Sequence, residues 1–126
     1  MEAKNIEELK SLISKYELID NDVIEIAKNE LLAEGKIANA FSIKKHLTGF
    51  GSKVTGSLCN KVENKANTYF HVKCEECVFG ADWACMKGEN AETYFGIENA
   101  VSTEDMVKAY KARAAFLKEK FSTLIT

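Results

Sequence analysis

The chain has 126 residues, of which 46% are hydrophobic and 29% charged, and its net charge is −2. This size and composition are typical of one globular domain that buries its own core without disulfide bonds. The apolar runs are short, and the N-terminus, MEAKNIEELK, carries acids where a signal peptide needs an apolar core. We therefore expect a soluble, cytoplasmic protein with no membrane partner.

Two helices are predicted at the N-terminus. Residues 5–17 repeat apolar side chains at helical spacing, at Ile6, Leu9, Leu12, Ile13 and Tyr16. Asp22, with Glu25 three residues later, resembles an acidic capping box and predicts the start of the second helix. Its apolar face is expected at Val23, Ile26, Ala27 and Leu31. Gly35 is placed to end it, and the tight turn between the helices predicts an antiparallel hairpin.

Residues 36–47, KIANAFSIKKHL, favour a third helix that ends at Gly49, although a strand is an alternative. On a helix, Lys44 falls in the middle of the face shared by Ile37, Ala40, Phe41 and Leu47. Its apolar stem could lie along these neighbours while the ammonium reaches water.

Two further helices are predicted near the C-terminus. Residues 90–100 form a short one that includes Gly96, and a glycine inside a helix suggests a close backbone contact. Ser102 with Asp105 starts the last helix, and Lys118 and Lys120 suit its negative end. Its apolar stripe contains Met106, Tyr110, Ala114, Leu117, Phe121 and Leu124.

The expected fold is mostly α, or α+β with a minimal sheet, in one domain spanning residues 1–126. An N-terminal helical hairpin in residues 1–47 and the C-terminal helices in residues 89–126 enclose an irregular, cysteine-rich centre, residues 48–88. Only TYFHV at 68–72 has the aromatic and β-branched composition of a strand. The two terminal parts should bury their apolar stripes against each other.

The cysteines have the spacing C-x14-C-x2-C-x7-C, at Cys59, Cys74, Cys77 and Cys85. A C-x2-C pair directs two thiolates to one metal ion, and two further cysteines complete a tetrahedral structural zinc site. The pattern departs from a zinc ribbon because only one such pair is present, and His71 could replace one thiolate.

Other chemistries fit the same four cysteines. They could hold an iron–sulfur cluster, which also takes four thiolates, or they could be inert reduced thiols that bind no cofactor. Two disulfides do not suit a cytoplasmic chain. A redox pair is disfavoured because Glu75 and Glu76, between Cys74 and Cys77, would oppose thiolate formation.

A second candidate site is the segment HLTGFGSKVTGSLCNK at 46–61, which contains three glycines, four hydroxyl residues and no acid. From Gly35 to Val62 the chain carries five lysines and no carboxylate, whereas the remainder has twelve basic and nineteen acidic residues. Backbone N–H groups and lysines suit a phosphate, and Phe50 could stack on a base, but neither standard phosphate fingerprint is present. The predicted ligand-binding residues are Lys44, Lys45, Thr48, Gly49, Phe50, Gly51, Ser52, Lys53 and Thr55. The alternative is a flexible connector.

No catalytic motif surrounds His46 or His71, so we assign no catalytic residue and expect a binding protein rather than an enzyme. The first hypothesis is a metal-stabilised helical module that binds a phosphate-bearing ligand, either nucleic acid or a nucleotide. The second is a protein-interaction or inhibitor domain, of the small phage-encoded type, that binds an acidic surface of a protein partner. The third is an iron–sulfur or thiol redox protein.

Overall fold

The computed structural model describes residues 6–48, 54 and 84–125, and within these ranges every regular element is a helix. The prediction of a mostly α fold is therefore confirmed for this part of the chain. The strand predicted at 68–72 lies outside the described residues, and of the cysteine-rich centre only residues 48, 54 and 84–88 are described. None of the described helices is long and apolar enough to cross a bilayer.

The helices come in two groups along the chain. The first contains α1 (Ile6–Leu18), α2 (Asn21–Ala33) and α3 (Ala40–Thr48). The second begins with two 3-10 turns, η1 (Ala84–Met86) and η2 (Gly88–Asn90), and continues with α6 (Ala91–Asn99), α7 (Thr103–Lys120) and α8 (Ser122–Ile125).

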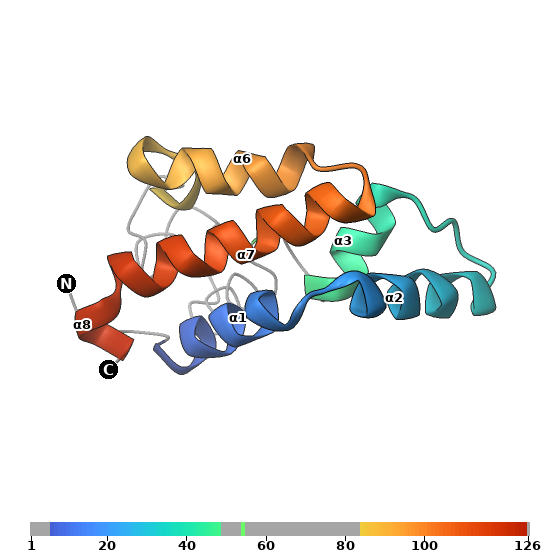
Figure 1. The fold of residues 1–126 in the computed structure, drawn as a ribbon, viewed down its shortest axis with the longest axis horizontal. Coiled ribbons are helices and arrows are strands. Elements are labelled where there is room, and N and C mark those ends of the chain that lie inside the picture. Colours follow the sequence, from blue (N-terminus) through green and yellow to red (C-terminus); the bar gives the residue numbers. More distant parts are fainter. Residues whose placement is uncertain (1–5, 49–53, 55–83, 126) are drawn as a thin grey trace, which may run out of the picture.

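Helix α7 is the centre of the bundle, with α1 on one side and α6 on the other (Figure 1). The apolar stripes predicted for α1 and α7 face each other, and the Tyr16 and Tyr110 rings lie with their centroids 5.0 Å apart. Leu9 and Leu117 are both fully buried. The expectation that the two terminal parts bury their stripes against each other is thus confirmed.

The predicted antiparallel hairpin of the first two helices is wrong. Helix α2 continues beyond the end of α1 instead of folding back on it (Figure 1), and it packs mainly against α3. Two residues separate α1 from α2, and one of them, Ile19, is only 1% exposed. Because α7 already covers the apolar stripe of α1, the stripe of α2 needs another partner, and α3 provides it.

The N-cap of α2 lies two residues before the predicted capping residue. Asp20, not Asp22, is the N-cap, and its carboxylate accepts a hydrogen bond of 2.9 Å from the Val23 amide. Asp22, two residues later, offers the same local signal, so the sequence pattern does not distinguish the two aspartates. The buried face also differs from the prediction, because Ile24 is fully buried while Ile26 is 57% exposed.

The predicted end of α2 at Gly35 is confirmed. Gly35 has a positive φ of 76°, and the amides of Gly35 and Lys36 donate to the carbonyls of Leu32 and Leu31 at 3.0 and 2.9 Å. This is the Schellman arrangement, in which a glycine adopts the left-handed conformation without a Cβ penalty. The chain then reverses its direction.

Helix α3 is shorter than predicted, since residues 36–39 precede it and Asn39 caps its first turn through a 2.8 Å bond from the Ser42 amide. Its buried face contains Ile43, Lys44 and Thr48, while Phe41 is 54% exposed. Ala40 and Leu47 are partly buried against the core as predicted, whereas Phe41 and the preceding Ile37 lie at the surface.

The C-terminal helices follow the predictions closely. Ser102 is the N-cap of α7, accepting a 3.1 Å bond from the Asp105 amide. Among the described residues, the close contact predicted at Gly96 is absent, because a Cβ added there would meet none of their atoms within 4 Å. The predicted stripe of α7 is buried from Met106 to Phe121, and the Leu124 side chain lies outside the described residues.

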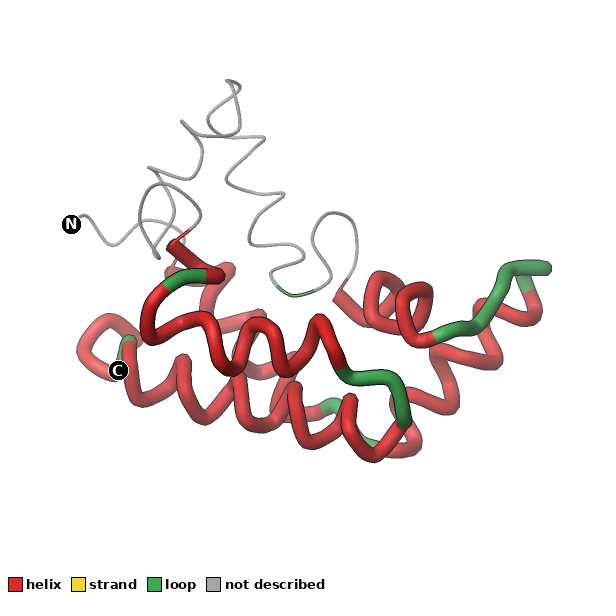
Figure 2. Tube along the Cα trace, turned by 90° about the horizontal axis from the view of Figure 1, so that it is seen from above, coloured by secondary structure: helices red, strands yellow, loops and turns green. Residues whose placement is uncertain are grey.

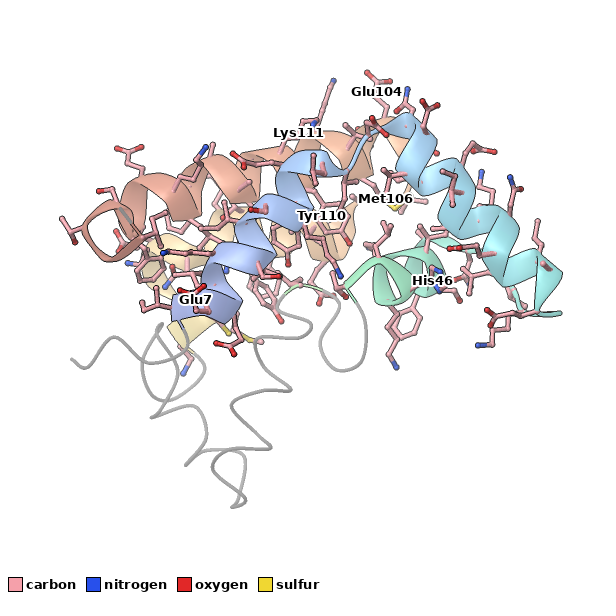
Figure 3. All side chains as sticks on the ribbon, turned by 90° about the horizontal axis from the view of Figure 1, so that it is seen from below. Glu7, His46, Glu104, Met106, Tyr110 and Lys111 are labelled. Atoms are coloured by element: carbon pink, nitrogen blue, oxygen red, sulfur yellow. The ribbon has the colours of Figure 1, made fainter. Side chains whose placement is uncertain are left out.

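Viewed from above, α2, α3 and the residues between them extend past one end of the α1–α6–α7 bundle (Figure 2). We call residues 21–48 the arm. Val54, the one described residue between α3 and η1, is fully buried with the core side chains. Figure 3 shows Met106 and Tyr110 pointing between the helices, whereas Glu104 and Lys111 point outward.

Candidate functional site

Cys85 is the one predicted metal ligand that the structure describes. It lies on η1 and is half-buried. Cys59, Cys74, Cys77 and His71 lie outside the described residues. Within residues 6–48, 54 and 84–125, no three His, Cys, Asp or Glu side chains gather to form a metal site. The four-cysteine zinc site therefore stays a prediction.

A buried arginine holds the backbone of Cys85. The Arg113 Nη2 atom donates to the Cys85 carbonyl at 3.2 Å, and Nη1 donates to the Asn90 carbonyl and the Thr93 hydroxyl, both at 2.9 Å. The guanidinium also lies 5.7 Å from the centroid of the Tyr94 ring. Burial lowers the pKa of Arg113 from its ordinary value. These bonds attach η1, η2 and the start of α6 to α7.

Lys44, a predicted phosphate contact, points into the protein. Its side chain is 3% exposed, and its Nζ donates to the carbonyls of Ile97, Glu98 and Ala100, each at 2.9 Å. These carbonyls stand at the C-terminal end of α6, where the helix dipole favours a cation. The ammonium therefore acts inside the fold, as the cap of α6.

Thr48 is also internal. It is 1% exposed, and its hydroxyl donates to the Lys44 carbonyl at 3.0 Å. Of the other predicted phosphate contacts, Lys45 is exposed on α3. The rest lie outside the described residues: Gly49, Phe50, Gly51, Ser52, Lys53 and Thr55. The predicted loop site therefore stays a prediction, although two of its members, Lys44 and Thr48, are buried.

The arm carries a groove of about 670 Å³ between α2 and α3. Ile37 and Phe41, which are 73% and 54% exposed, form its apolar walls. The described residues that line it are Leu31, Gly35, Lys36, Ile37, Phe41, Ser42, Lys45 and His46. Large apolar side chains that are exposed together, within a polar rim, are typical of an interaction surface.

The charges that line the groove are basic. Lys45 lies over the Phe41 ring, with its Nζ 5.7 Å from the ring centroid. Lys36 forms an ion pair with Glu34 at 2.8 Å, and this contact lowers the pKa of the Glu34 carboxyl. His46 on α3, labelled in Figure 3, contacts the carboxylate of Glu30 on α2 at 2.9 Å. Both carboxylates lie outside the groove lining.

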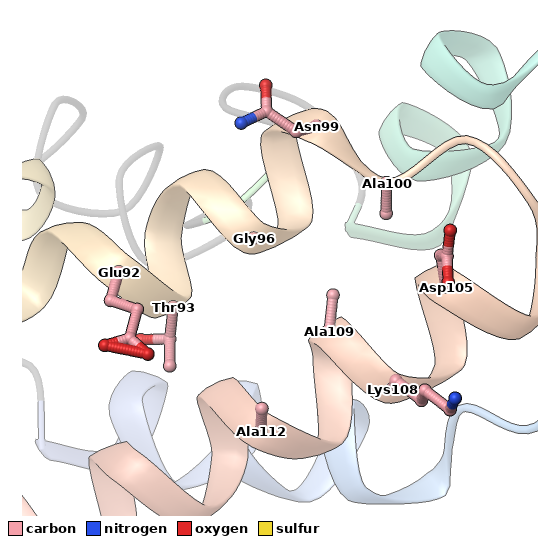
Figure 4. A pocket seen from close by; sticks show the side chains of 9 residues that line it. All are labelled: Glu92, Thr93, Gly96, Asn99, Ala100, Asp105, Lys108, Ala109 and Ala112. Carbon is pink, nitrogen blue, oxygen red and sulfur yellow. The ribbon is translucent and has the colours of Figure 1, made fainter.

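A second hollow, of about 450 Å³, lies between α6 and α7 (Figure 4). Its floor consists of small residues, with Gly96 on α6 opposite Ala109 and Ala112 on α7 (Figure 4). Glu92, Asp105 and Lys108 are also part of the lining. This surface has neither large apolar side chains nor charge of one sign, so its chemistry favours no particular ligand.

Within the part of the chain that the structure describes, the buried hydroxyls of Tyr16 and Tyr110 have no hydrogen-bond partner. Burial is the main cause that raises the pKa of both phenols well above their ordinary value. For Tyr16 the next cause is the neighbouring Tyr110, and for Tyr110 it is the Glu98 carboxylate. These phenols stay protonated in the folded protein at neutral pH.

The α2–α3 groove was not predicted from the sequence. Phe41 and Ile37 were expected on the buried face of their helix, because apolar residues usually face the core. One signal was present in the sequence: a lysine in the middle of that face. In the structure this lysine is buried with three carbonyl partners, and Phe41, at the edge of the same face, lies at the surface.

No family model, no curated protein and no solved structure matches this chain. The function is therefore inferred from the geometry of this protein itself.

Proposed function

We propose that this protein is a protein-interaction module and that the arm is its docking element. The observation that carries this proposal is the exposure of Ile37 and Phe41 beside the groove. Two other large apolar residues of the arm, Ile26 and Leu32, are 57% and 58% exposed. Removing such surfaces from water on binding is favourable by about 25 cal/mol per Å² of apolar area.

The competing hypothesis is the phosphate-binding surface. Among the described residues, the side chains of Lys44 and Thr48 are buried, which leaves Lys45 as the exposed predicted contact. Binding of nucleic acid usually requires several cations along one surface. The arm offers instead an aliphatic and aromatic surface with a few cations, a composition more typical of protein interfaces. Binding of nucleic acid or a nucleotide therefore stays a prediction and takes second place.

A photo-crosslinking experiment distinguishes these two functions. A benzophenone amino acid would replace Ile37 in one variant and Leu18 in a matched control, and both would be irradiated in the cells that naturally make the protein. Ile37 and Leu18 are equally exposed, at 73% and 72%, and Leu18 lies at the end of α1, one helix length from the groove.

We expect protein adducts from position 37 and not from position 18. A nuclease-sensitive adduct from position 37 would instead support the nucleic-acid hypothesis. If neither position forms an adduct, or both form the same ones, the arm is not a specific docking element and the proposal is wrong.

A further inference from the structure

We infer that the groove between α2 and α3 binds an acidic segment of its partner protein, with apolar side chains of that segment placed between Ile37 and Phe41. This inference rests on the proposed function and specifies the chemistry of the partner. It depends on three features of the groove: its apolar walls, the sign of the charges that line it, and the rigidity of its two sides.

The walls suit apolar side chains. The Leu31 side chain, 4% exposed, forms part of the base, and Ile37 and Phe41 stand beside it, more than half exposed. A volume of about 670 Å³ falls within the usual size range of ligand sites, about 300–1,000 Å³. A short peptide segment that inserts one or two apolar side chains would fill this space, and the remainder of the segment would lie on the rim.

The charges select against a basic segment. Among the described residues, the groove lining includes Lys36 and Lys45 and no carboxylate; Glu34, which pairs with Lys36, lies outside the lining. The Lys45 ammonium lies over the Phe41 ring, so a carboxylate that follows an apolar side chain into the groove would meet this ammonium at its edge. A lysine or arginine at the same place would face a like charge, which lowers affinity and excludes the wrong partner.

The stretch of the sequence that lacks Asp and Glu fits the same groove for an acidic segment. The stretch without any Asp or Glu begins at Gly35, and seven of the eight lining residues fall within it. Lys44 belongs to this stretch, but its ammonium is directed to α6. Lys36 and Lys45 are the lysines of the described part of this stretch that line the groove.

Both sides of the groove are held in place before any partner binds. On the α2 side, the Schellman bonds fix Gly35 and Lys36 against the end of the helix. On the α3 side, Asn39 caps the first turn, and Lys44 joins the helix to the end of α6. A preformed surface loses little conformational entropy on binding, and this favours useful affinity from a small contact area.

The test is a selection of peptides from a displayed library of random sequences. Binders to the wild-type protein would be collected after the library has been depleted on a Phe41→Ser variant. Ile26→Ser is the control for a change at an exposed apolar residue, because Ile26 is similarly exposed and does not line the groove. Circular dichroism and thermal melting would confirm that each variant is folded.

We expect the selected peptides to be acidic and to contain apolar side chains. The charge would then be tested with the double variant Lys36→Glu, Lys45→Glu, and with Lys15→Glu, Lys108→Glu as the control of equal net charge on α1 and α7. A selected peptide should bind the first variant about tenfold more weakly and the second about as well as the wild type. Phe41→Ser should reduce its affinity by about tenfold or more, and Ile26→Ser should not.

Three results would overturn the inference: selected peptides that are basic or uncharged, no enrichment above the depleted library, or equal effects of the two charge variants. An oligonucleotide that binds the groove more tightly than every selected peptide would assign it to a phosphate-bearing ligand. If position 37 still crosslinks to a protein when this selection fails, only the acidic partner is wrong. If that crosslink is also absent, the proposed function is wrong as well.

Discussion

Lys44 and Arg113 hold the two ends of α6. The Lys44 ammonium binds the carbonyls of Ile97, Glu98 and Ala100 at its C-terminal end, and the Arg113 guanidinium binds the Asn90 carbonyl and the Thr93 hydroxyl at its start. One cation comes from α3 and the other from α7, and both are buried. Helix α6 thus depends on two charges that lie far from it in the sequence.

The Lys44 bonds give the first prediction. Lys44→Met keeps the apolar stem and removes the ammonium, so that each of the three carbonyls at the end of α6 loses one charged donor. We expect the free energy of unfolding to fall by about 2–4 kcal/mol, measured by urea denaturation. Lys45→Met, at the neighbouring exposed position, should change it by less than about 0.5 kcal/mol. Equal effects of the two substitutions would contradict the capping role of Lys44.

The second prediction concerns the core between α1 and α7. Leu9 and Leu117 are fully buried, so replacing either by alanine should lower the free energy of unfolding by about 2–5 kcal/mol. Leu18→Ala and Leu32→Ala are controls, because these residues are 72% and 58% exposed. The controls should stay within about 0.5 kcal/mol of the wild type. A small loss at Leu9 or Leu117 would remove that residue from the core.

The third prediction uses the two core hydroxyls that have no partner. Tyr16→Phe or Tyr110→Phe removes a buried hydroxyl without removing a hydrogen bond. Because burying such a group is unfavourable, each variant should be as stable as the wild type at pH 7 or more stable, by up to about 1 kcal/mol. A loss of more than about 1 kcal/mol in equilibrium unfolding would show that the hydroxyl has a partner.

The fourth prediction is a dependence of stability on alkaline pH. The pKa values of Tyr16 and Tyr110 are raised in the folded state, so the folded protein keeps protons that the unfolded chain releases above about pH 10. Their contribution is complete below that pH and is lost as the pH rises, by up to about 1.4 kcal/mol per pH unit for each tyrosine.

The double variant Tyr16→Phe, Tyr110→Phe is the control for the alkaline effect. It should lose stability less steeply than the wild type above about pH 10, when urea denaturation is repeated at increasing pH. Identical slopes for the two proteins would mean that these phenols titrate normally in the folded state.

The fifth prediction is the zinc site expected from the cysteine spacing. Elemental analysis of untagged protein should find about one zinc ion per chain, and a chelator should lower the melting temperature. A variant with Cys74 and Cys77 replaced by serine should lack zinc. Metal-free protein whose melting is unchanged by the chelator would contradict the site, and a brown protein with visible absorbance would indicate an iron–sulfur cluster instead.

The local features of the chain were predictable from its sequence. The apolar stripes of α1 and α7, the Ser102 cap and the Gly35 terminus depend on residues within one or two turns of each other. The stretch without carboxylates that starts at Gly35 was also visible, but it was interpreted as part of a phosphate-binding segment and not as the lining of a groove. The cap of α2 was misplaced by two residues, because Asp20 and Asp22 offer the same short-range signal.

The partners of each helix were not predictable in the same way. We expected α1 to pack on α2 because the two helices are adjacent in the sequence. In the structure α1 packs on α7, which lies about a hundred residues later in the chain. Gly96 was expected to mark a close contact and instead faces open space. Periodicity shows that a helix has an apolar face, and it carries no information about which other face will cover it.

Lys44 shows most clearly where local reasoning ends. A lysine that interrupts an apolar face, within a basic segment, is visible in the amino-acid sequence alone. That three carbonyls at the end of α6, more than fifty residues away, accept its ammonium is visible only in the folded protein. Lys44 is thereby held inside the fold, and Phe41 and Lys45 beside it line the groove. A hydrogen-bond network of this kind depends on the positions of distant backbone groups, which exist only after the helices have packed.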